Sequence, residues 1–511
     1  MHHRKALVLL TVLVSAFAFS PEASSEYYEG YTLIAKPNST QTKLLDESNQ
    51  TVWNWVHNRM GGYSSYLLPD GNLLRPAYGG SSDLFGGAVA GVVQSWSPEG
   101  DLDWEFIYAS NSYRTHHDIE PLPNGNVLLT AWEVKTGAEA VQAGLDHTAE
   151  IWPDHIIEVE PVGSSGGNIV WEWHAWDHLV QDHDPSKDNF GVVPDHPELL
   201  DINLDGEGGG PGSADWLHVN GISYDPVYDQ IAITSHTLNE VWVIDHSTTT
   251  AEAAGHSGGN SGMGGDILYR WGSPSNYDRP GSQIFHVVHC PFWIPENCPG
   301  AGNLMAYNNG EGTGISTIVE LELPRDGYGY FLEAGEAYGP DSPVWTYSAP
   351  GFYSNHLGGC QRLPNGNTMI AESTSGYLFE VDASSATQWS YAASGEYARV
   401  LRYGVSYAGL EPLGLQVDAP ESPSIAQYLS QNYPNPFNPK TTIVYRLPQE
   451  GRVSLKIYDM EGRVLRTLVE GVQEAGEHSR VFNAEGLASG IYIYKLEAAG
   501  ISETRRLALL Q

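Results

Sequence analysis

Cysteine and basic residues are scarce in this chain of 511 residues. It has three cysteines, and its 25 lysines and arginines stand against 62 aspartates and glutamates, which gives a formal charge of −37. A surface this acidic repels nucleic acid and anionic membranes, so neither is expected as a partner. It also means that a site for an anionic substrate has to create its own positive potential locally.

Long apolar runs are missing as well, with one exception at the N-terminus. Residues 1–5 are basic, residues 6–19 are apolar, and Ala16-Phe17-Ala18 offers the small residues of a cleavage site. This pattern is typical of a signal peptide over residues 1–20, and the apolar stretch is too short to span a bilayer comfortably. We therefore expect an exported protein without a transmembrane segment.

The odd number of cysteines leaves their pairing open. Export allows disulfides to form, and Cys290 and Cys298 bracket a short loop that such a bond could close. Cys360 is then free, or the pairing is a different one. The sequence is compatible both with a Cys290–Cys298 disulfide and with free thiols.

Several motifs of metal and nucleotide chemistry are also absent. The chain has no His-Glu-x-x-His, no Cys-x-x-Cys and no Gly-x-x-x-x-Gly-Lys-Ser/Thr phosphate loop. Asp201, Asn203 and Asp205 match the first half of a calcium loop, but its twelfth position is Gly212, where a bidentate glutamate is needed. A solvated acidic loop is the simpler interpretation, and calcium binding is the alternative.

Tryptophan and glycine, by contrast, are abundant and follow a repeating pattern. Six β-rich segments close on a tryptophan: Trp53, Trp104, Trp171, Trp271, Trp345 and Trp389. Turns rich in Pro, Gly and Asn, such as Leu68-Pro69-Asp70-Gly71-Asn72, precede four of them and supply the backbone angles of a tight hairpin. A sheet unit repeated about every 50 to 70 residues is typical of propeller blades. The pattern predicts an all-β protein with a six-bladed β-propeller over residues 27–415.

The last part of the chain has a different composition. Residues 416–426 contain Pro and Ser and are expected to form a linker, and residues 427–511 hold alternating strands that predict a small immunoglobulin-like β-sandwich. The run Asn-Tyr-Pro-Asn-Pro-Phe-Asn-Pro at 432–439, the strand start Gly490-Ile491-Tyr492 and the pair Arg505-Arg506 resemble the C-terminal sorting domain of the type IX secretion system. The resemblance implies that the secretion machinery is a partner, that the protein crosses an outer membrane, and that it is secreted or held at the cell surface.

Histidine is the residue that points to chemistry. Four segments that enter a predicted inner strand carry it, at His116-His117-Asp118, His218-Val219-Asn220, His289-Cys290 and Asn355-His356. The first strand of each propeller blade lines the central channel, so equivalent positions in four blades should converge on one axis. A lone histidine is usually structural, whereas four at equivalent positions indicate a functional cluster.

These segments, with Ser235-His236 and the run Gly302-Asn303-Leu304 to Gly310, together resemble the bacterial arylsulfate sulfotransferases over most of residues 27–410. The family is a six-bladed propeller that moves a sulfuryl group from an aryl sulfate to a phenol and uses no nucleotide cofactor. The resemblance implies that His289 takes the sulfuryl group covalently, that His117 and His218 are catalytic, and that Asn220 grips sulfate oxygens. His236 and the neighbouring His116 and His356 are expected to bind the substrate.

Two positions depart from the family pattern. His236 stands where the family commonly has arginine, and Val288 stands where the residue before the nucleophile is often glutamine. Because histidine titrates near pH 6.5 and arginine does not, sulfate binding through His236 would depend on pH.

The chemistry that follows is a two-step transfer. Neutral His289 attacks sulfur, cationic or donor neighbours bind the sulfate oxygens, and either His218 or His117 acts first as acid to the leaving phenol and then as base to the acceptor. No cofactor is expected. Two alternatives stay open, namely a non-catalytic secreted binding module and a metal-dependent enzyme that uses the channel histidines.

Overall fold

The computed structural model describes residues 27–204 and 214–416 and, beyond them, residues 429, 432, 437, 439–447, 451–459, 463–484, 486–488, 490–498 and 501–509. The predicted signal peptide, residues 417–426 of the predicted linker, and Asp205 lie outside the described residues. Contacts divide the chain into two compact units, Met1–Asp418 and Ala419–Gln511.

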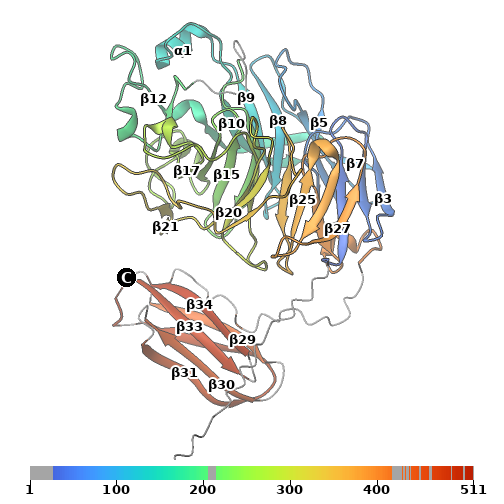
Figure 1. Ribbon diagram of the computed structural model, residues 1–511, viewed down its shortest axis with the longest axis vertical. Coiled ribbons are helices and arrows are strands. Elements are labelled where there is room, and N and C mark those ends of the chain that lie inside the picture. Colours follow the sequence, from blue (N-terminus) through green and yellow to red (C-terminus); the bar gives the residue numbers. More distant parts are fainter. Residues whose placement is uncertain are drawn as a thin grey trace, which may run out of the picture. The chain divides into compact units, whose positions relative to one another are not determined.

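Six four-stranded antiparallel sheets build the first unit (Figure 1), which confirms the predicted six-bladed propeller. Written from one edge to the other, the first three blades are β28 (Leu401–Gly404), β1 (Gly30–Ala35), β2 (Gln41–Leu45) and β3 (Thr51–Val56); β4 (Tyr66–Leu67), β5 (Leu73–Tyr78), β6 (Gly91–Trp96) and β7 (Leu102–Ile107); and β8 (Tyr113–Pro121), β9 (Val127–Glu133), β10 (Asp154–Val162) and β11 (Gly166–His174).

The remaining three blades follow the same order. They are β14 (Val219–Asp225), β15 (Gln230–Ser235), β16 (Glu240–Asp245) and β17 (Tyr269–Trp271); β18 (Val288–Trp293), β19 (Leu304–Asn308), β20 (Thr317–Leu321) and β23 (Trp345–Tyr347); and β24 (Gly359–Arg362), β25 (Thr368–Glu372), β26 (Tyr377–Val381) and β27 (Thr387–Ala392). Neighbouring blades pack through their first strands, β8 against β14, β14 against β18, and β18 against β24. These strands are therefore the inner ones.

The ring is closed by strands from the two ends of the unit. β28 pairs antiparallel with β1, with Leu401 opposite Leu33, so the last strand of the unit completes the first blade. This pairing joins residues more than 360 positions apart, so it closes the ring by building the first blade from both ends of the unit.

The repeated tryptophans lie in the outermost strands, and their indole N–H groups explain why they recur. Trp104 donates to the Gly166 carbonyl at 2.7 Å, Trp271 to Pro340 at 2.9 Å, and Trp389 to Glu47 at 3.1 Å, and each acceptor belongs to the next blade. A buried indole needs a partner for its N–H, and here that partner fastens one blade to the next. For these three tryptophans the sequence repeat is thus a repeat of blade-to-blade contacts.

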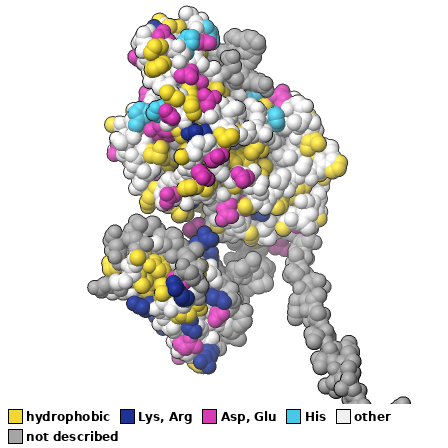
Figure 2. Space-filling view, turned by 60° about the vertical axis from the view of Figure 1, so that its left-hand side comes forward, with side chains coloured by type: hydrophobic (Ala, Val, Ile, Leu, Met, Phe, Trp, Pro, Cys, Tyr) yellow, Lys and Arg dark blue, Asp and Glu magenta, His cyan; other side chains and the backbone are white. Residues whose placement is uncertain are grey.

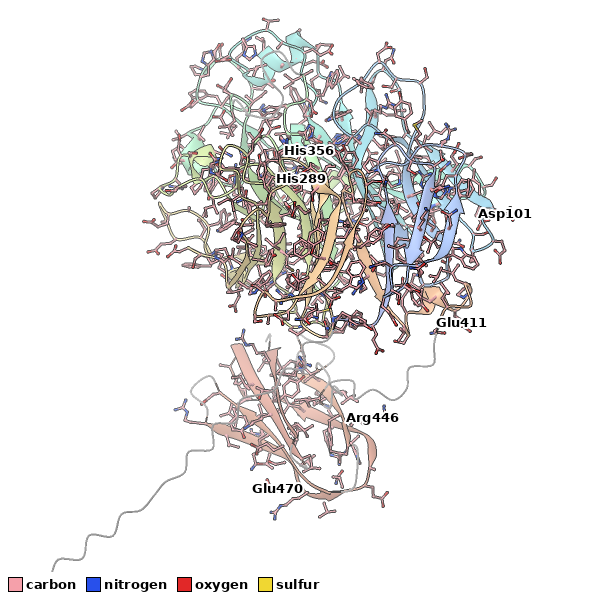
Figure 3. The ribbon with its side chains drawn as sticks, turned by 45° about the vertical axis from the view of Figure 1, so that its right-hand side comes forward. Asp101, His289, His356, Glu411, Arg446 and Glu470 are labelled. Atoms are coloured by element: carbon pink, nitrogen blue, oxygen red, sulfur yellow. The ribbon has the colours of Figure 1, made fainter. Side chains whose placement is uncertain are left out.

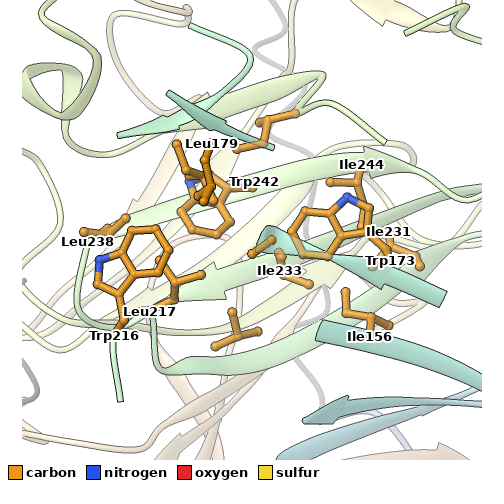
Figure 4. Packing of buried hydrophobic residues seen from close by; sticks show 14 of the residues in the cluster. Ile156, Trp173, Leu179, Trp216, Leu217, Ile231, Ile233, Leu238, Trp242 and Ile244 are labelled. Carbon is orange, nitrogen blue, oxygen red and sulfur yellow. The ribbon is translucent and has the colours of Figure 1, made fainter. Parts of the chain in front are cut away.

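Apolar side chains between successive blades form the core. The largest cluster joins the third and fourth blades, with Ile156 and Trp173 facing Ile231, Ile233 and Trp242 (Figure 4), and all five are at most 1% exposed. At roughly 25 cal/mol per Å² of apolar area, each fully buried side chain of this size contributes about 2 to 3 kcal/mol. This packing holds the inner strands in place.

The propeller unit also contains short helices, strands and 3₁₀ turns outside the blade sheets. They are α1 (Gly137–Ala143), α2 (Thr250–Ala253), the short strands β12 (Leu179–Val180), β13 (Leu200–Asp201), β21 (Arg325–Asp326) and β22 (Gly329–Tyr330), and the 3₁₀ turns η1 (Ala175–Asp177), η2 (Val193–Asp195), η3 (Pro274–Tyr277), η4 (Ser373–Ser375) and η5 (Ala408–Leu410). Both α-helices start at a capping box, in which Thr136 pairs with Glu139 and Thr249 with Glu252. No helix within the described ranges is long and apolar enough to cross a membrane.

The second unit consists of two antiparallel sheets. They are β29 (Lys440–Leu447) with β32 (Gly476–Asn483), and β31 (Val464–Gln473), β30 (Gly451–Tyr458), β33 (Gly490–Ala498) and β34 (Ile501–Leu509). Ile443 and Tyr445 of one sheet share a buried cluster with Leu455, Ile457 and Tyr494 of the other. The unit is therefore a small β-sandwich, while its immunoglobulin-like connectivity stays a prediction.

The two units differ in charge. Residues 419–511 hold 10 of the 25 basic and 10 of the 62 acidic residues, so the whole charge excess belongs to the propeller unit. On the face drawn in Figure 2, acidic side chains are spread over the propeller unit, and basic side chains gather on the other. An anionic substrate would thus approach the propeller against its overall field.

Candidate active site in the propeller channel

All six blades contribute to one cavity at the centre of the propeller. Its lining residues come from the inner strands or the residues just before them: Tyr63, Ser64, Asp118, Asn220, His289, Cys290, Leu357, Gly358, Ala398 and Arg399. His289 and His356 are drawn in the middle of the propeller unit in Figure 3. Several elements converge here on a few polar groups, as in small-molecule sites, but the cavity is small, with about 270 Å³ of empty space.

Irregular backbone aims the polar side chains of the inner strands. Pairing shifts register between Thr115 and Ile119 in β8, and between His289 and Phe292 in β18. His117, His218 and Cys290 have φ of 50°, 50° and 51°, in the left-handed region that costs a non-glycine residue roughly 1 to 2 kcal/mol. β-Bulges re-aim side chains, and in these blades they lie beside the cavity.

The structure brings four of the sequence-predicted histidines into one row. Ring centroids are 4.5 Å apart for His117 and His218, 4.8 Å for His218 and His236, and 5.7 Å for His236 and His289. These side chains come from β8 and from the segments around β14, β15 and β18. Three of the four predicted equivalent positions, His117, His218 and His289, thus lie in one row, which is completed by His236 from the same blade as His218, whereas His356 makes none of these ring contacts.

Asn309 determines which nitrogen of His289 carries the proton. The Asn309 amide donates its two N–H groups to the carbonyls of Ser354 and Leu357, at 2.7 and 2.5 Å, so its Oδ1 is an acceptor. That oxygen lies 2.7 Å from His289 Nδ1, which must then carry a hydrogen. Nε2 keeps its lone pair, which accepts the Leu357 N–H at 3.3 Å. Burial lowers the pKa of His289 to about 3, so the ring is neutral.

His218 is the channel histidine with a carboxylate partner. Its Nδ1 lies 2.6 Å from Asp215 Oδ2, and Asp215 in turn accepts the indole N–H of Trp132. Burial lowers the pKa of His218, but the negative charge of Asp215, with a smaller contribution from Asp154, outweighs it and raises the pKa above its ordinary value. His218 is therefore the channel imidazole best able to hold a proton at neutral pH.

His289 is the histidine among the cavity-lining residues, and His116 lies next to His117, at the other end of the histidine row. The two Nδ1 atoms are 2.8 Å apart, and His116 Nε2 lies 2.8 Å from Asp154 Oδ1. His116 is 1% exposed and stacks on Trp132 at a centroid distance of 4.1 Å. Burial, with the charges of His218 and His116, lowers the pKa of His117 well below its ordinary value, so His117 is neutral. His116 thus orients His117 and has no open nitrogen of its own.

The expected sulfate-binding residues occupy different environments. Asn220 donates its amide N–H to the Val288 carbonyl at 2.8 Å and accepts the Thr234 hydroxyl at 2.6 Å. Burial lowers the pKa of His236, and the charges of His218 and His289 lower it further, so His236 is neutral as well. His356 is half-exposed and faces Glu396 at 3.4 Å. Val288 is fully buried in the blade core, where its side chain cannot act as glutamine would.

Sequence reasoning missed Arg399 and gave Cys290 only a possible disulfide. Arg399 lies just before β28, lines the cavity and is 3.3 Å from Asp118, while its Nη2 contacts Cys290 Sγ at 3.5 Å. Hydrogen bonding from the Cys360 side chain and the charge of Arg399, against burial, lower the pKa of the Cys290 thiol to about 6. No turn motif or repeat marks Arg399, because it enters the ring only through the closing strand. Asp215 could have been found from its Asp-x-x-His spacing.

One candidate from the sequence needs correction, namely the disulfide. All three cysteines fall within the described residues and are free and buried, so the Cys290–Cys298 disulfide is absent. Cys290 instead contacts the backbone of Cys360 at 3.5 and 3.7 Å, and Cys298 contacts the Arg362 carbonyl at 3.5 Å. The two cysteines of the loop are directed to different places on the neighbouring blade, because the intervening strand β18 is extended.

The described residues of the candidate calcium loop, Asp201 and Asn203, make ordinary loop contacts. Asp201 Oδ1 accepts the Asn203 N–H at 2.9 Å, and the Asn203 amide bridges Gly144 and Asp146. Among the described residues, one group of side chains has metal-ligating spacing, namely His178, His256 and Asp266. Its members are not channel residues.

Comparisons with known proteins agree with this site. A model of the family Arylsulfotransferase (ASST) matches residues 100–400, and a model of the Secretion system C-terminal sorting domain matches residues 431–509. The arylsulfate sulfotransferase AssT of Escherichia coli O6:H1 is 26% identical over 297 residues, which cover 52% of this chain and 46% of that protein. The chain thus matches less than half the length of this curated relative.

Solved structures with similar folds are distant. A protein of unknown function from Bacteroides caccae shares 11% identity, covers 73% of this chain and 98% of its own, and has a TM-score of 0.40. AztD from Citrobacter koseri shares 10% identity over 90% of this chain and 100% of its own, with a TM-score of 0.32. Because both TM-scores are below 0.5, these structures carry no further argument about the fold.

Proposed function

The chain belongs to the arylsulfotransferase family, whose model spans more than half of its length, and we propose that it transfers a sulfuryl group from an aryl sulfate ester to a phenol without a nucleotide donor. The observation that carries the proposal is the pairing of a neutral imidazole, His289, whose unprotonated Nε2 accepts only the Leu357 N–H at 3.3 Å, with a proton-holding imidazole, His218, in one channel. The C-terminal match indicates export through a secretion system.

The first half-reaction uses His289 as nucleophile. Its Nε2 lone pair attacks sulfur, an N–S bond forms, and the bond between sulfur and the aryl oxygen breaks. Asn309 Oδ1 supports this step, because it accepts the Nδ1–H at 2.7 Å while positive charge develops on the ring. The phenoxide departs and the sulfuryl group stays on His289.

His218 is the better of the two expected acid–base groups. Its pKa is raised, so the imidazolium can give its proton to the departing phenoxide, and the resulting neutral ring can take the proton of the acceptor phenol in the second half-reaction. The pKa of His117 is lowered by burial, which makes His117 a poor acid. We assign His117 to orienting the sulfate, with His116 and Asp154 behind it.

The positive potential for the sulfate comes from few groups. His236 is neutral here, so it can donate only one hydrogen bond where the family arginine would add a charge. Arg399 is the arginine among the residues that line the cavity. We therefore assign the sulfate charge to protonated His218 and to Arg399, with Asn220 as a neutral donor.

A covalent adduct tests the proposal. The purified protein is mixed with an aryl sulfate and no acceptor, and its intact mass is compared for wild type, His289→Ala and the surface control His147→Ala. We expect a gain of one sulfuryl group in wild type and in the control and none in His289→Ala. If wild type gains no mass and releases no phenol from several donors, the transferase proposal fails and the propeller acts as a binding module.

The match to a secretion-system sorting domain supports a separate proposal about export. We propose that the second unit is recognised by the type IX secretion machinery and that the propeller unit acts outside the cell or on its surface. Deleting residues 427–511 should retain the propeller inside the outer membrane, as fractionation with an antibody would detect.

A further inference from the structure

Three side chains outside the channel converge on one point beside the fourth blade. His178 follows η1, while His256 and Asp266 belong to the glycine-rich segment 254–266 between α2 and β17. Asp266 Oδ1 lies 2.8 Å from His178 Nδ1 and 2.7 Å from His256 Nδ1. The ligand-type atoms of all three residues lie within 4.8 Å of one another.

The hydrogen bond made by the other ring nitrogen of His178 indicates that a cation lies between the converging atoms. His178 Nε2 lies 2.8 Å from the Ala253 carbonyl, so Nε2 carries a hydrogen. A neutral His178 then directs the lone pair of Nδ1 at the oxygen of a carboxylate. Lone pair against carboxylate is repulsive, so a cation has to lie between them, either a proton or a metal ion. An imidazole whose other N–H is held by a backbone carbonyl is the usual arrangement of a metal-ligating histidine.

The surroundings hold the three residues in place. His178 is fully buried and stacks on Trp173 at 5.7 Å, and the Trp173 indole donates to the Gly265 carbonyl at 2.7 Å. Gly265 has no room for a side chain, because a Cβ would lie 1.9 Å from the Ala253 oxygen and 2.6 Å from His178 Nε2. The segment 254–266 therefore closes tightly on His178, as a preorganised site requires.

We propose that His178, His256 and Asp266 bind one divalent first-row transition metal ion such as Zn²⁺, through two imidazole Nδ1 atoms and one carboxylate oxygen. Two nitrogens and one oxygen suit zinc, whose tetrahedral ligand atoms lie about 3.3 Å apart when each bond is about 2.0 to 2.1 Å. The two observed edges of 2.8 and 2.7 Å need to open by about half an ångström. His256 is 62% exposed, so the fourth coordination position of the metal ion would face water.

The ion would join two parts of the chain that are distant in sequence. His178 belongs to the connection between the third and fourth blades, and the other two ligands belong to a segment inside the fourth blade. Binding thus stabilises the folded propeller by mass action, with no part in sulfuryl transfer.

Metal binding to tag-free protein tests the proposal. Wild type, His256→Ala and Asp266→Asn are dialysed, titrated with Zn²⁺, and measured for bound zinc and for thermal stability; Co²⁺ replaces Zn²⁺ to record the absorption of a tetrahedral site. The matched control is His147→Ala, because His147 is 60% exposed and also pairs with one carboxylate, at 2.6 Å, but has no third ligand.

We expect one zinc per chain in wild type and in His147→Ala, and binding at least about 100-fold weaker in the two ligand variants. Zinc should raise the melting temperature of wild type and not that of His256→Ala. No binding by wild type would mean that a proton occupies the site and would overturn the proposal. Zinc retained by His256→Ala but lost by His218→Ala would place the metal in the channel and would also overturn it.

Discussion

The propeller holds two clusters of imidazoles that differ in their carboxylates. In the channel, His117, His236 and His289 have no carboxylate within salt-bridge distance, and burial lowers the pKa of each. Beside the fourth blade, His178 and His256 both face Asp266. The three channel imidazoles are therefore neutral and keep a lone pair for chemistry, whereas in the second cluster two imidazole nitrogens and one carboxylate oxygen converge on one point, as the ligands of a metal ion do.

His218 is the informative intermediate case. It lies in the channel row but has its own carboxylate, Asp215, at 2.6 Å. His218 therefore holds the proton and His289 keeps the lone pair. Two identical side chains can take these different roles only because their surroundings differ. The same logic separates the acid and base in other enzymes with paired titratable groups.

Removal of the neutral nucleophile should have the largest effect on activity. His289→Ala deletes the atom that forms the N–S bond, so turnover of an aryl sulfate should fall by about 10⁴-fold or more. Phenol release followed in a spectrophotometer measures this. Zinc binding by the same variant should be unchanged, and a turnover within tenfold of wild type would contradict the assignment.

Removing the charge partner of His218 should have the second-largest effect. Because the donor half-reaction needs the His218 imidazolium, its rate falls as pH rises through the raised pKa of His218. Asp215→Asn lowers that pKa, so the fall should begin at lower pH, and the rate at pH 7 should drop by about 10²-fold. A pH–rate profile with donors of different leaving groups measures this.

The leaving group provides the control for that prediction. Phenols that leave easily need little protonation, so a nitrophenyl sulfate should be affected much less than an unsubstituted phenyl sulfate. An equal loss for both donors would assign Asp215 a purely structural role.

A smaller change should follow from adding charge at the neutral position. His236→Arg introduces a permanent cation beside the sulfate site, and we expect kcat/KM for the donor to rise about tenfold at pH 7. His236→Gln is the matched control and should change kcat/KM little, since His236 is already neutral. Steady-state kinetics at low donor concentration measure both variants.

The smallest expected effect concerns a carboxylate-paired histidine that lies outside both clusters. Burial lowers the pKa of His246, but Asp229 and Glu158, at 2.7 and 3.1 Å, raise it to about 9. A raised folded-state pKa stabilises the fold below pH 6.5, and this stabilisation is lost as pH rises towards 9. We expect a loss of about 1 kcal/mol over that range, discounted for the partly exposed Asp229.

Urea unfolding at several pH values measures this loss. All 15 tryptophans precede residue 390, so their fluorescence reports on the propeller unit alone. His246→Gln should flatten the dependence of the unfolding free energy on pH between 6.5 and 9. An unchanged slope in the variant would assign the pH dependence to other groups.

The blades were predictable because they repeat. Trp104 and Trp389 recur at equivalent places since each fastens one blade to the next, and turn residues such as Pro69 and Gly71 encode hairpins locally. The places of His117, His218 and His289 in the row were predictable for the same reason, because equivalent residues in propeller blades have equivalent distances from the axis, whereas His236 follows a second strand and is not part of that repeat. Local patterns of this kind need no knowledge of long-range contacts.

Residues that meet only through ring closure were not predictable. Arg399 and Cys290 are separated by more than 100 residues, and β28 brings them together by pairing with β1. The candidate Cys290–Cys298 bond, one of two possibilities left open by the sequence, is absent because nearness in sequence does not decide where extended strands direct their side chains.

The sequence by itself determined the number of blades, the sorting-domain signature and the row of channel histidines, since each is written in residues that repeat or lie close together. Only the tertiary structure decided which imidazole is neutral and which is charged. The pKa of a buried group depends on the burial, carboxylates and amides around it in space, such as Asn309 for His289 and Asp215 for His218, and only the folded chain brings these neighbours into place.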